Sequence, residues 1–224
     1  MIRILLILLF TSSLCGQSAM DQVLAERSST GSTTAAGFQP FDIRDKGIKG
    51  SRYLFSDWTK GILYFENGDV YDQYLINLDA YSQSIVVVDG DRLVDLPTHF
   101  VKYFSLSPEG SVSEKIFNKV KLEDQQVFAE LLLDGDYQLL KIGSTKIRKA
   151  NFNPALNAGE INDRFISTYK YYLSYNDQVR LIQQKKKKCL KDFNDLLEFQ
   201  SLVKKFGVKN ELDLIAIFQE LNNN

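Results

Sequence analysis

Short apolar runs separated by tight-turn signals fill residues 61–106. Asn67-Gly68 and Asp89-Gly90 are hairpin signals, because such pairs accept the positive φ angles that two-residue hairpin turns require. The runs between them are rich in Ile, Leu, Val, Tyr and Phe, which suit a pleated, half-buried surface. Links this short favour antiparallel pairing, since parallel strands need long crossover connections. The stretch therefore predicts an antiparallel β-meander.

The pattern of strands and turns continues to residue 183, with further turn signals at residues 134–136 (Asp-Gly-Asp) and 176–177 (Asn-Asp). The expected strands are Ile62–Glu66, Val70–Leu78, Ser84–Val88, Arg92–Leu96, Val101–Leu106, Lys115–Leu122, Gln126–Leu133, Tyr137–Ile142, Phe165–Tyr175 and Gln178–Gln183. Lys146–Ala150 predicts either one more short strand or an extended link. We expect a polar loop at Asn151–Asp163.

Helical spacing of apolar residues replaces the strand pattern over Lys185–Phe206. Gly207 is suited to end this helix, and Asn210 can cap a second one. The two helices would form a hairpin that packs on the sheet. The predicted fold class is therefore α+β and mainly β, an antiparallel meander or sheet followed by a C-terminal helical hairpin. The expected segments are a signal peptide (1–19), a flexible linker (20–46), an antiparallel β domain (47–183) and the helical hairpin (184–224).

The N-terminus has the layout of a secretory signal peptide. Arg3 precedes an apolar run at Ile4–Phe10, and small or polar residues follow. The run is far shorter than the ~20 residues of a membrane-spanning helix, so we expect none in the mature chain. Cys15 would be lipidated only as the first mature residue, and Leu14 is not the small residue of a bacterial lipobox. We expect export to the periplasm, the outer membrane or the extracellular space.

Charge and motif content exclude several function classes. A balance of 27 Lys and Arg against 28 Asp and Glu argues against a nucleic-acid partner, which usually selects a basic excess. No nucleotide-binding glycine loop is present in the sequence. His99 is the only histidine. A triad would have to be built on it, but the sequence has no G-x-S-x-G nucleophile elbow, and zinc sites want three or four ligands from His, Cys and carboxylates. Cys189 follows four lysines that would activate an exposed thiol, but its place before Leu190 favours burial. We expect no catalytic residue, metal or cofactor.

Aromatic residues are the binding candidates. Tyr169, Tyr171 and Tyr175 share one predicted strand face, with Tyr172 on the other. If they are exposed, such a ladder stacks on sugar rings or covers a partner's surface. If they are buried, it stabilises the sheet, and this packing role is favoured. Trp58, the only tryptophan, is either a ligand platform or an anchor for the end of the sheet, with packing again favoured.

Several segments together carry a resemblance to a known group. They are KGSRYLFSDWTKGILYFENGDVYDQYLINLDAYSQSIVVV, FAELLLDGDYQLLKI, STYKYYLSYNDQVRLIQQKKKKCLKDF and ELDLIAIFQEL. Over residues 47–221 the chain resembles a group of uncharacterised exported proteins of Bacteroidota. The resemblance lies in patterns of hydrophobic residues, aromatic residues and turns. It implies export and a β-rich fold with a helical tail, and it implies no catalytic residue.

These observations lead to three expectations of function. The leading one is a non-catalytic exported protein of the cell envelope that binds another protein or has a structural role. The second is a glycan-binding module that uses tyrosine or tryptophan faces. The third is a hydrolase that uses a pair of carboxylates brought together by the fold.

Overall fold

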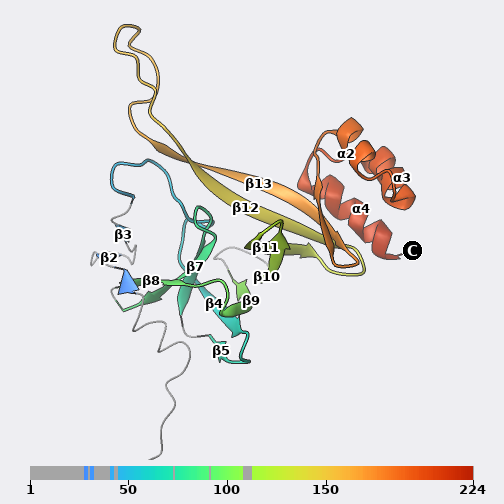
Figure 1. Ribbon diagram of the computed structural model, residues 1–224, viewed down its shortest axis with the longest axis horizontal. Coiled ribbons are helices and arrows are strands. Elements are labelled where there is room, and N and C mark those ends of the chain that lie inside the picture. The colour runs from blue at the N-terminus through green and yellow to red at the C-terminus, as the bar shows by residue number, and fades with distance from the viewer. Residues whose placement is uncertain are drawn as a thin grey trace, which may run out of the picture.

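The computed structural model describes residues 28–29, 31–32, 41–42, 45–72, 74–90, 92–107 and 113–223. Within these residues the fold is mainly β, with an antiparallel sheet of twelve strands, a two-stranded sheet and three C-terminal helices (Figure 1). The predicted class, α+β and mainly β, is confirmed. Cys15 and the rest of the expected signal peptide lie outside the described residues. No helix in the described part of the chain is long and apolar enough to cross a membrane.

The N-terminal part of the large sheet is organised by β4, which pairs with β9 on one side and with β5 and β6 on the other. Its strands are β4 (Thr59–Phe65), β5 (Val70–Tyr71), β6 (Leu75–Asp79), β7 (Ser84–Asp89), β8 (Arg92–Leu96) and β9 (Val101–Leu106). Three short strands precede them: β1 (Ser28–Ser29) pairs with β8, and β2 (Gly31–Ser32) pairs with β3 (Phe41–Asp42). Part of the segment expected as a linker is therefore paired with other strands.

The C-terminal part of the sheet is a meander in which each strand pairs with the next one along the chain. Its strands are β10 (Lys115–Leu122), β11 (Gln125–Leu133), β12 (Gln138–Arg148), β13 (Arg164–Tyr175) and β14 (Gln178–Ile182). Turn residues lie where the sequence predicts them. Gly135 has a φ of 145° between β11 and β12, and Asn176 and Asp177 have φ of 49° and 59° between β13 and β14.

Two strand predictions differ from the structure. The expected strand Val70–Leu78 is split into β5 and β6, because the chain first pairs with the end of β4 and then with its beginning. The segments Tyr137–Ile142 and Lys146–Ala150 form instead one long strand, β12, because pairing with β13 is unbroken over residues 138–148.

A first hydrophobic core lies between β6–β8 and the strands β4, β9, β10 and β11. Three phenylalanine rings form its centre. Phe104 stacks on Phe117 with ring centroids 4.7 Å apart and meets Phe128 edge-on at 5.1 Å. Gly61 lets β4 approach its neighbours closely, since a Cβ atom there would lie 2.6 Å from the carbonyl oxygen of Ser105. Around this core, β6–β8 form one β-layer, which packs face to face on a second layer formed by β4 and β9–β11.

Three helices end the described chain: α2 (Lys186–Asp192), α3 (Leu197–Phe206) and α4 (Glu211–Asn223). The predicted helix Lys185–Phe206 is wrong as a single element, because a turn interrupts it. At that turn Arg180 of β14 binds the carboxylate of Asp195, with 2.7 Å between Nη1 and Oδ2. The helices pack on one face of β11–β14 and enclose a second core, which includes Leu139, Tyr171, Leu173, Ile182, Cys189, Phe193, Phe199, Val203, Leu214, Ile217 and Phe218.

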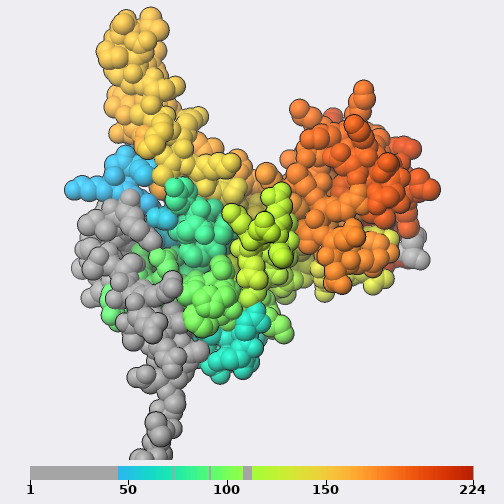
Figure 2. Space-filling view, viewed as in Figure 1, coloured from blue at the N-terminus to red at the C-terminus, as the bar shows by residue number. Residues whose placement is uncertain are grey.

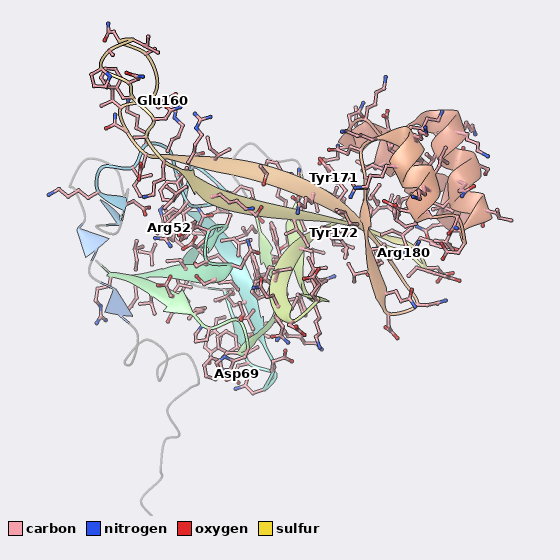
Figure 3. The ribbon with its side chains drawn as sticks, turned by 45° about the horizontal axis from the view of Figure 1, so that its top comes forward. Arg52, Asp69, Glu160, Tyr171, Tyr172 and Arg180 are labelled. Atoms are coloured by element: carbon pink, nitrogen blue, oxygen red, sulfur yellow. The ribbon has the colours of Figure 1, made fainter. Side chains whose placement is uncertain are left out.

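β12 and β13 form a long hairpin that links all these parts. Figure 1 shows it running from the helices, past the N-terminal strands, to a loop that stands clear of the rest. We call residues 149–163 the hairpin tip. Tyr171 and Tyr172 lie on opposite faces of this hairpin, the first in the core under the helices and the second in a separate apolar cluster (Figure 3). We call these the helix-covered face and the groove face.

Candidate functional site

The hairpin tip is an ordered loop held by its own hydrogen bonds. The backbone N–H of Asn151 donates to the carbonyl of Glu160 (3.0 Å), and that of Asn153 donates to the carbonyl of Ala158 (2.8 Å). The side chain of Asn153 accepts from the N–H of Ala155 at 3.0 Å, which closes the turn. A loop organised in this way loses little conformational entropy on binding.

Gly159 is required by this loop. Its φ of 103° lies in a region that glycine adopts readily, and a Cβ atom there would lie 2.5 Å from the carbonyl oxygen of Asn151. Asn157 also has a positive φ, of 43°, which asparagine tolerates better than most residues. The residues of the tip therefore specify its turns.

Three large apolar side chains of the tip are exposed to solvent. Leu156 is 74% exposed, Ile161 72% and Phe152 40%. None of the residues from 150 to 159 is charged. Figure 2 shows the tip as a narrow projection from the body, so these side chains can be reached from several directions. Single exposed apolar residues are ordinary, but a group of them on one ordered projection indicates an interaction surface.

Paired charges surround the base of the tip. Glu160 lies between Arg148 and Arg164, with nitrogen–oxygen distances of 3.5 and 3.9 Å. Lys149 pairs with Asp163 at 2.8 Å. The hydrogen bond from Lys149 lowers the pKa of Asp163, so this carboxylate stays ionised. The base of the tip thus presents charges of both signs around an uncharged end.

The groove face of β10–β14 is a second candidate site. β10 approaches β14, so the sheet curls around this face. The apolar residues along it are Val120, Leu122, Val127, Ala129, Leu131, Leu140, Ile142, Tyr172, Val179 and Leu181. A cavity of about 700 Å³ lies over the part near β14. A second, of about 570 Å³, extends it towards Tyr81 and Lys146. Clefts of this size hold small molecules or a few side chains of a partner.

Charged residues border the groove. Lys121 and Lys170 line it near β14, and Lys146 lines its extension. None of these three lysines forms an ion pair with another residue in the described ranges. Glu123 and Asp124 also line it, in the turn between β10 and β11 that follows Lys121. The floor residues Val127, Ile142 and Tyr172 are themselves only 7–9% exposed, so the accessible border of the groove is formed largely by charges of both signs.

The structure separates the tyrosines that the sequence places in one candidate ladder. Tyr171 is buried under the helices. Tyr175 stacks on Tyr137 at the edge of the same core, with ring centroids 4.3 Å apart. Tyr169 is 46% exposed, and the ammonium of Lys141 lies 4.9 Å from its ring centroid. The three rings therefore do not form one exposed aromatic face.

Trp58 is a half-buried packing residue in the N-terminal part. Its ring meets that of Tyr53 edge-on, with centroids 5.2 Å apart. Both rings pack against a cluster on β6–β8 that includes Leu75, Val88 and Leu93. Trp58 belongs to a different cluster from Tyr171 and does not extend a common aromatic surface with it.

A polar network joins α4 to the sheet beneath it. The Nζ of Lys141 lies 2.8 Å from Oε2 of Glu211, which also accepts a hydrogen bond from the hydroxyl of Tyr171 at 3.0 Å. Burial opposes ionisation of Glu211, but the hydrogen bonds from Lys141 and Tyr171 outweigh it and lower the pKa of Glu211. Burial likewise acts against the charge of Lys141, yet Glu211 and Glu130 raise its pKa. Both groups stay charged, so the network holds the helix in place and does not supply a poised acid or base.

His99 and Cys189 have side chains that often act in catalysis, but neither lies in a catalytic arrangement with other described residues. His99 is exposed beside Phe100, with ring centroids 4.1 Å apart. Cys189 is fully buried under the helices, and burial raises its pKa to about 11. That pKa keeps it a thiol, whereas nucleophilic cysteines need a thiolate. His, Cys, Asp and Glu side chains within the described ranges form no group that could hold a metal ion.

The sequence prediction missed both candidate surfaces. Residues 151–163 are expected as a polar loop, although they hold Phe152, Leu156 and Ile161. Large apolar residues between the turn-forming Asn, Pro and Gly residues are a signal that could have identified the tip. The groove offers no comparable signal, because its lining comes from five strands that meet only in the folded chain.

Comparisons with protein-family models, with curated proteins and with solved structures give no match to this chain.

Proposed function

We propose that this chain is an exported, non-catalytic protein of the cell envelope that binds another protein through the hairpin tip. The observation that carries the proposal is the group of exposed apolar side chains, Phe152, Leu156 and Ile161, on an ordered projection. Fully burying a side chain such as Leu or Ile contributes about 1.5–3 kcal/mol. Insertion of two or three of them into a partner's pocket would contribute roughly 3–9 kcal/mol before the cost of association.

The chemistry of the tip favours a protein as the partner. The two most exposed apolar side chains, Leu156 and Ile161, are aliphatic and lack the flat ring face on which sugar rings stack, and Phe152 is the one ring of the group. The uncharged end also loses no charge hydration when it enters an apolar pocket, whereas buried unpaired charges are costly. Export is supported by the signal-peptide layout of the first residues and by the resemblance to exported proteins of Bacteroidota.

Site-specific cross-linking in the producing cells tests this function. A photo-reactive amino acid replaces Leu156, and in a matched control it replaces Leu197 of α3, which is 75% exposed against 74% for Leu156. We expect a discrete protein adduct from position 156 and none from position 197. Mass spectrometry of the adduct identifies the partner and the peptide that was contacted.

A substitution experiment separates loss of binding from loss of folding. The double change Leu156→Asn and Ile161→Asn should abolish capture of that partner by the tagged protein. The matched change Leu197→Asn and Leu212→Asn, at helix positions 75% and 76% exposed, should leave capture intact. Equal adducts from positions 156 and 197, or equal capture by both double variants, would overturn the proposal. Circular dichroism confirms that each variant is folded.

A further inference from the structure

One edge of β13 is open between β14 and the N-terminal part of the chain. β14 pairs with β13 only over Tyr171–Tyr175. Nearer the tip, Lys49 closes the same edge, because its backbone N–H donates to the carbonyl of Asp163 and its carbonyl accepts from the N–H of Phe165. Between these contacts lie residues 167–170, four exposed residues that we call the open edge. Figure 1 shows β13 as the outer strand of the hairpin, with β12 between it and the N-terminal strands.

The backbone of the open edge directs hydrogen-bonding groups towards solvent. The N–H of Phe165 points away from β12, towards Lys49, and Tyr171 is paired with β14. Because backbone groups alternate in direction along a strand, those of Ser167 and Tyr169 point the same way. No residue in the described ranges donates to these groups or accepts from them. Unpaired N–H and C=O groups in a row are a template for pairing with another strand.

The opposite edge of the hairpin is closed at the same level. The N–H of Thr145 donates to the carbonyl of Ala80 at 2.9 Å, and the side-chain amide of Gln83 donates to the carbonyl of Gly143 at 3.0 Å. Thr145 and Gly143 are the cross-strand partners of the two outward-directed residues of the open edge. The same two pairs are therefore satisfied on the β12 side and unpaired on the β13 side, although proteins usually protect such edges.

Positive charge surrounds the end of the open edge that is nearest the helices. A cavity of about 360 Å³ lies there, and its lining includes Lys170 and Lys185 but no acidic residue. Lys185 begins a run of four exposed lysines, 185–188. Neither Lys170 nor any lysine of this run forms an ion pair with another described residue. The neighbouring carboxylate of Glu211 is already bound by Lys141. An acidic ligand therefore has charge complementarity with this end of the edge.

The gap has room for a single strand but not for the same edge of a second copy. In that copy β14 and Lys49 occupy the edge of β13 on either side of the gap. If two open edges paired, these flanking segments of each copy would coincide with β13 of the other. The occupant is therefore a narrow extended segment rather than the sheet of another copy.

We propose that an extended acidic segment of a partner protein binds to the open edge as an added β-strand. It lies in line with β14 and exchanges backbone hydrogen bonds with Ser167 and Tyr169, as in other cases of β-strand addition. Cross-strand neighbours share a face, so the segment's residue opposite Tyr169 contacts a ring that is 46% exposed. The next residue meets the ammonium of Lys170, so apolar residues alternate with Asp or Glu. This site is separate from the hairpin tip, and the inference goes beyond the proposed function without depending on it.

Selection of peptides tests the chemistry of the occupant. A phage library of random peptides of about ten residues is selected on the protein purified after export. We expect the recovered peptides to carry Asp or Glu at alternating positions and to bind Lys170→Glu at least about tenfold more weakly than the unmodified protein. Lys102→Glu makes the same charge change at an exposed position of β9 and should bind normally. Failure to recover binders, or recovery of binders without acidic residues, would overturn the proposal.

Ser167→Pro tests the addition of a strand. It removes an N–H that points to solvent and keeps the hydrogen bonds to β12, and proline is tolerated on edge strands in this orientation. Binding of the selected peptides should fall at least about tenfold, because a peptide carbonyl loses its donor. Amide hydrogen exchange gives a second readout on the unmodified protein. The peptide should slow exchange at Ser167 and Tyr169 at least about tenfold, and more than at the amides of β4.

The results separate strand addition from simple charge attraction and from the function of the tip. Equal binding by the unmodified protein and Ser167→Pro would overturn the proposal, and so would a complex in which the amides of Ser167 and Tyr169 stay unprotected. The tip variant with Leu156→Asn and Ile161→Asn should bind the selected peptides like the unmodified protein. Loss of the strand site therefore leaves the cross-links from position 156 unaffected, and absence of those cross-links leaves the strand site unaffected.

Discussion

The helix-covered face and the groove face belong to the same strands, yet their surroundings differ. On the first, Tyr171 is enclosed by α4 and its neighbours, and its hydroxyl is bound by Glu211. On the second, Tyr172 is equally buried, at 9% exposed for each residue, but it is covered by the curl of the sheet and borders a cavity. Tyr171 and Tyr172 are consecutive residues, yet they face different environments, because successive side chains of a strand point to opposite faces of the sheet. The comparison teaches that one face of a sheet can be buried by helices and the other by the curl of the sheet itself.

The largest expected effect concerns Cys189 of α2, which is buried in the core between the helices and the helix-covered face. Iodoacetamide at about pH 8 should alkylate it at least about a thousandfold more slowly in the native protein than in urea, because unfolded fractions of native proteins are of order 10⁻³ or less. Its pKa of about 11 slows the reaction further. Mass spectrometry of the peptide that contains Cys189 measures both rates. Native alkylation within about tenfold of the unfolded rate would show that the helices do not seal this face.

The next effect is on the free energy of unfolding. Phe218→Ala removes a fully buried ring from the core under the helices and should lower the free energy of unfolding by about 3–5 kcal/mol. Leu212→Ala, at an exposed position of the same helix, should change it by less than about 0.5 kcal/mol. Urea titrations measure both. Similar losses for the two variants would contradict the assignment of α4 to the core.

A smaller, pH-dependent effect is expected at Glu211. Because its pKa is lowered in the folded protein, its contribution is present above the unfolded pKa of about 4.3 and is lost as the pH falls through the folded value. Glu211→Gln should therefore cost about 1 kcal/mol near neutral pH and almost nothing in strong acid. The control is Glu220→Gln on the same helix, whose exposed pair with Lys205 should contribute little at any pH. If the cost of Glu211→Gln does not change with pH, the stabilisation does not come from the ionised carboxylate of Glu211.

The smallest effects on stability are expected at the two candidate surfaces. Leu156→Asn at the tip and Val179→Lys on the groove face should each lower the free energy of unfolding by less than about 1 kcal/mol. Thermal unfolding monitored by circular dichroism checks this. A loss as large as that of Phe218→Ala would mean that the surface in question is part of the core, and its role in binding would have to be reconsidered.

Local signals account for what the sequence predicts well. The sequence predicts correctly the strand ends near Gly90 and near Asn176-Asp177. Each of these turns is encoded by the residues that form it. The expected alternation of Tyr171 and Tyr172 also follows from a local rule, the period of two along a strand. The break between α2 and α3 is missed because a residue of β14, Arg180, binds at that turn.

The arrangement of the candidate surfaces depends on non-local contacts. β4 pairs with β9 rather than only with its neighbours in sequence, which no turn signal encodes. The groove requires β10 to approach β14 across a curled sheet. The tip begins where the pairing of β12 with β13 ends at Arg148 and Arg164, beside the backbone hydrogen bonds of Lys49 to Asp163 and Phe165, and strand propensity alone does not state where that pairing ends.

The position of β4 also has a kinetic consequence. β4 joins β9 between Gly61 and Leu106, whereas β10 to β14 pair only with their neighbours in sequence. Pairings between distant residues slow folding. A chain that emerges N-terminus first, as the proposed export requires, would present β4 long before its partner arrives. The edge of β4 that pairs with β9 would stay open until residues 101–106 have emerged, and it would need protection from aggregation during that interval.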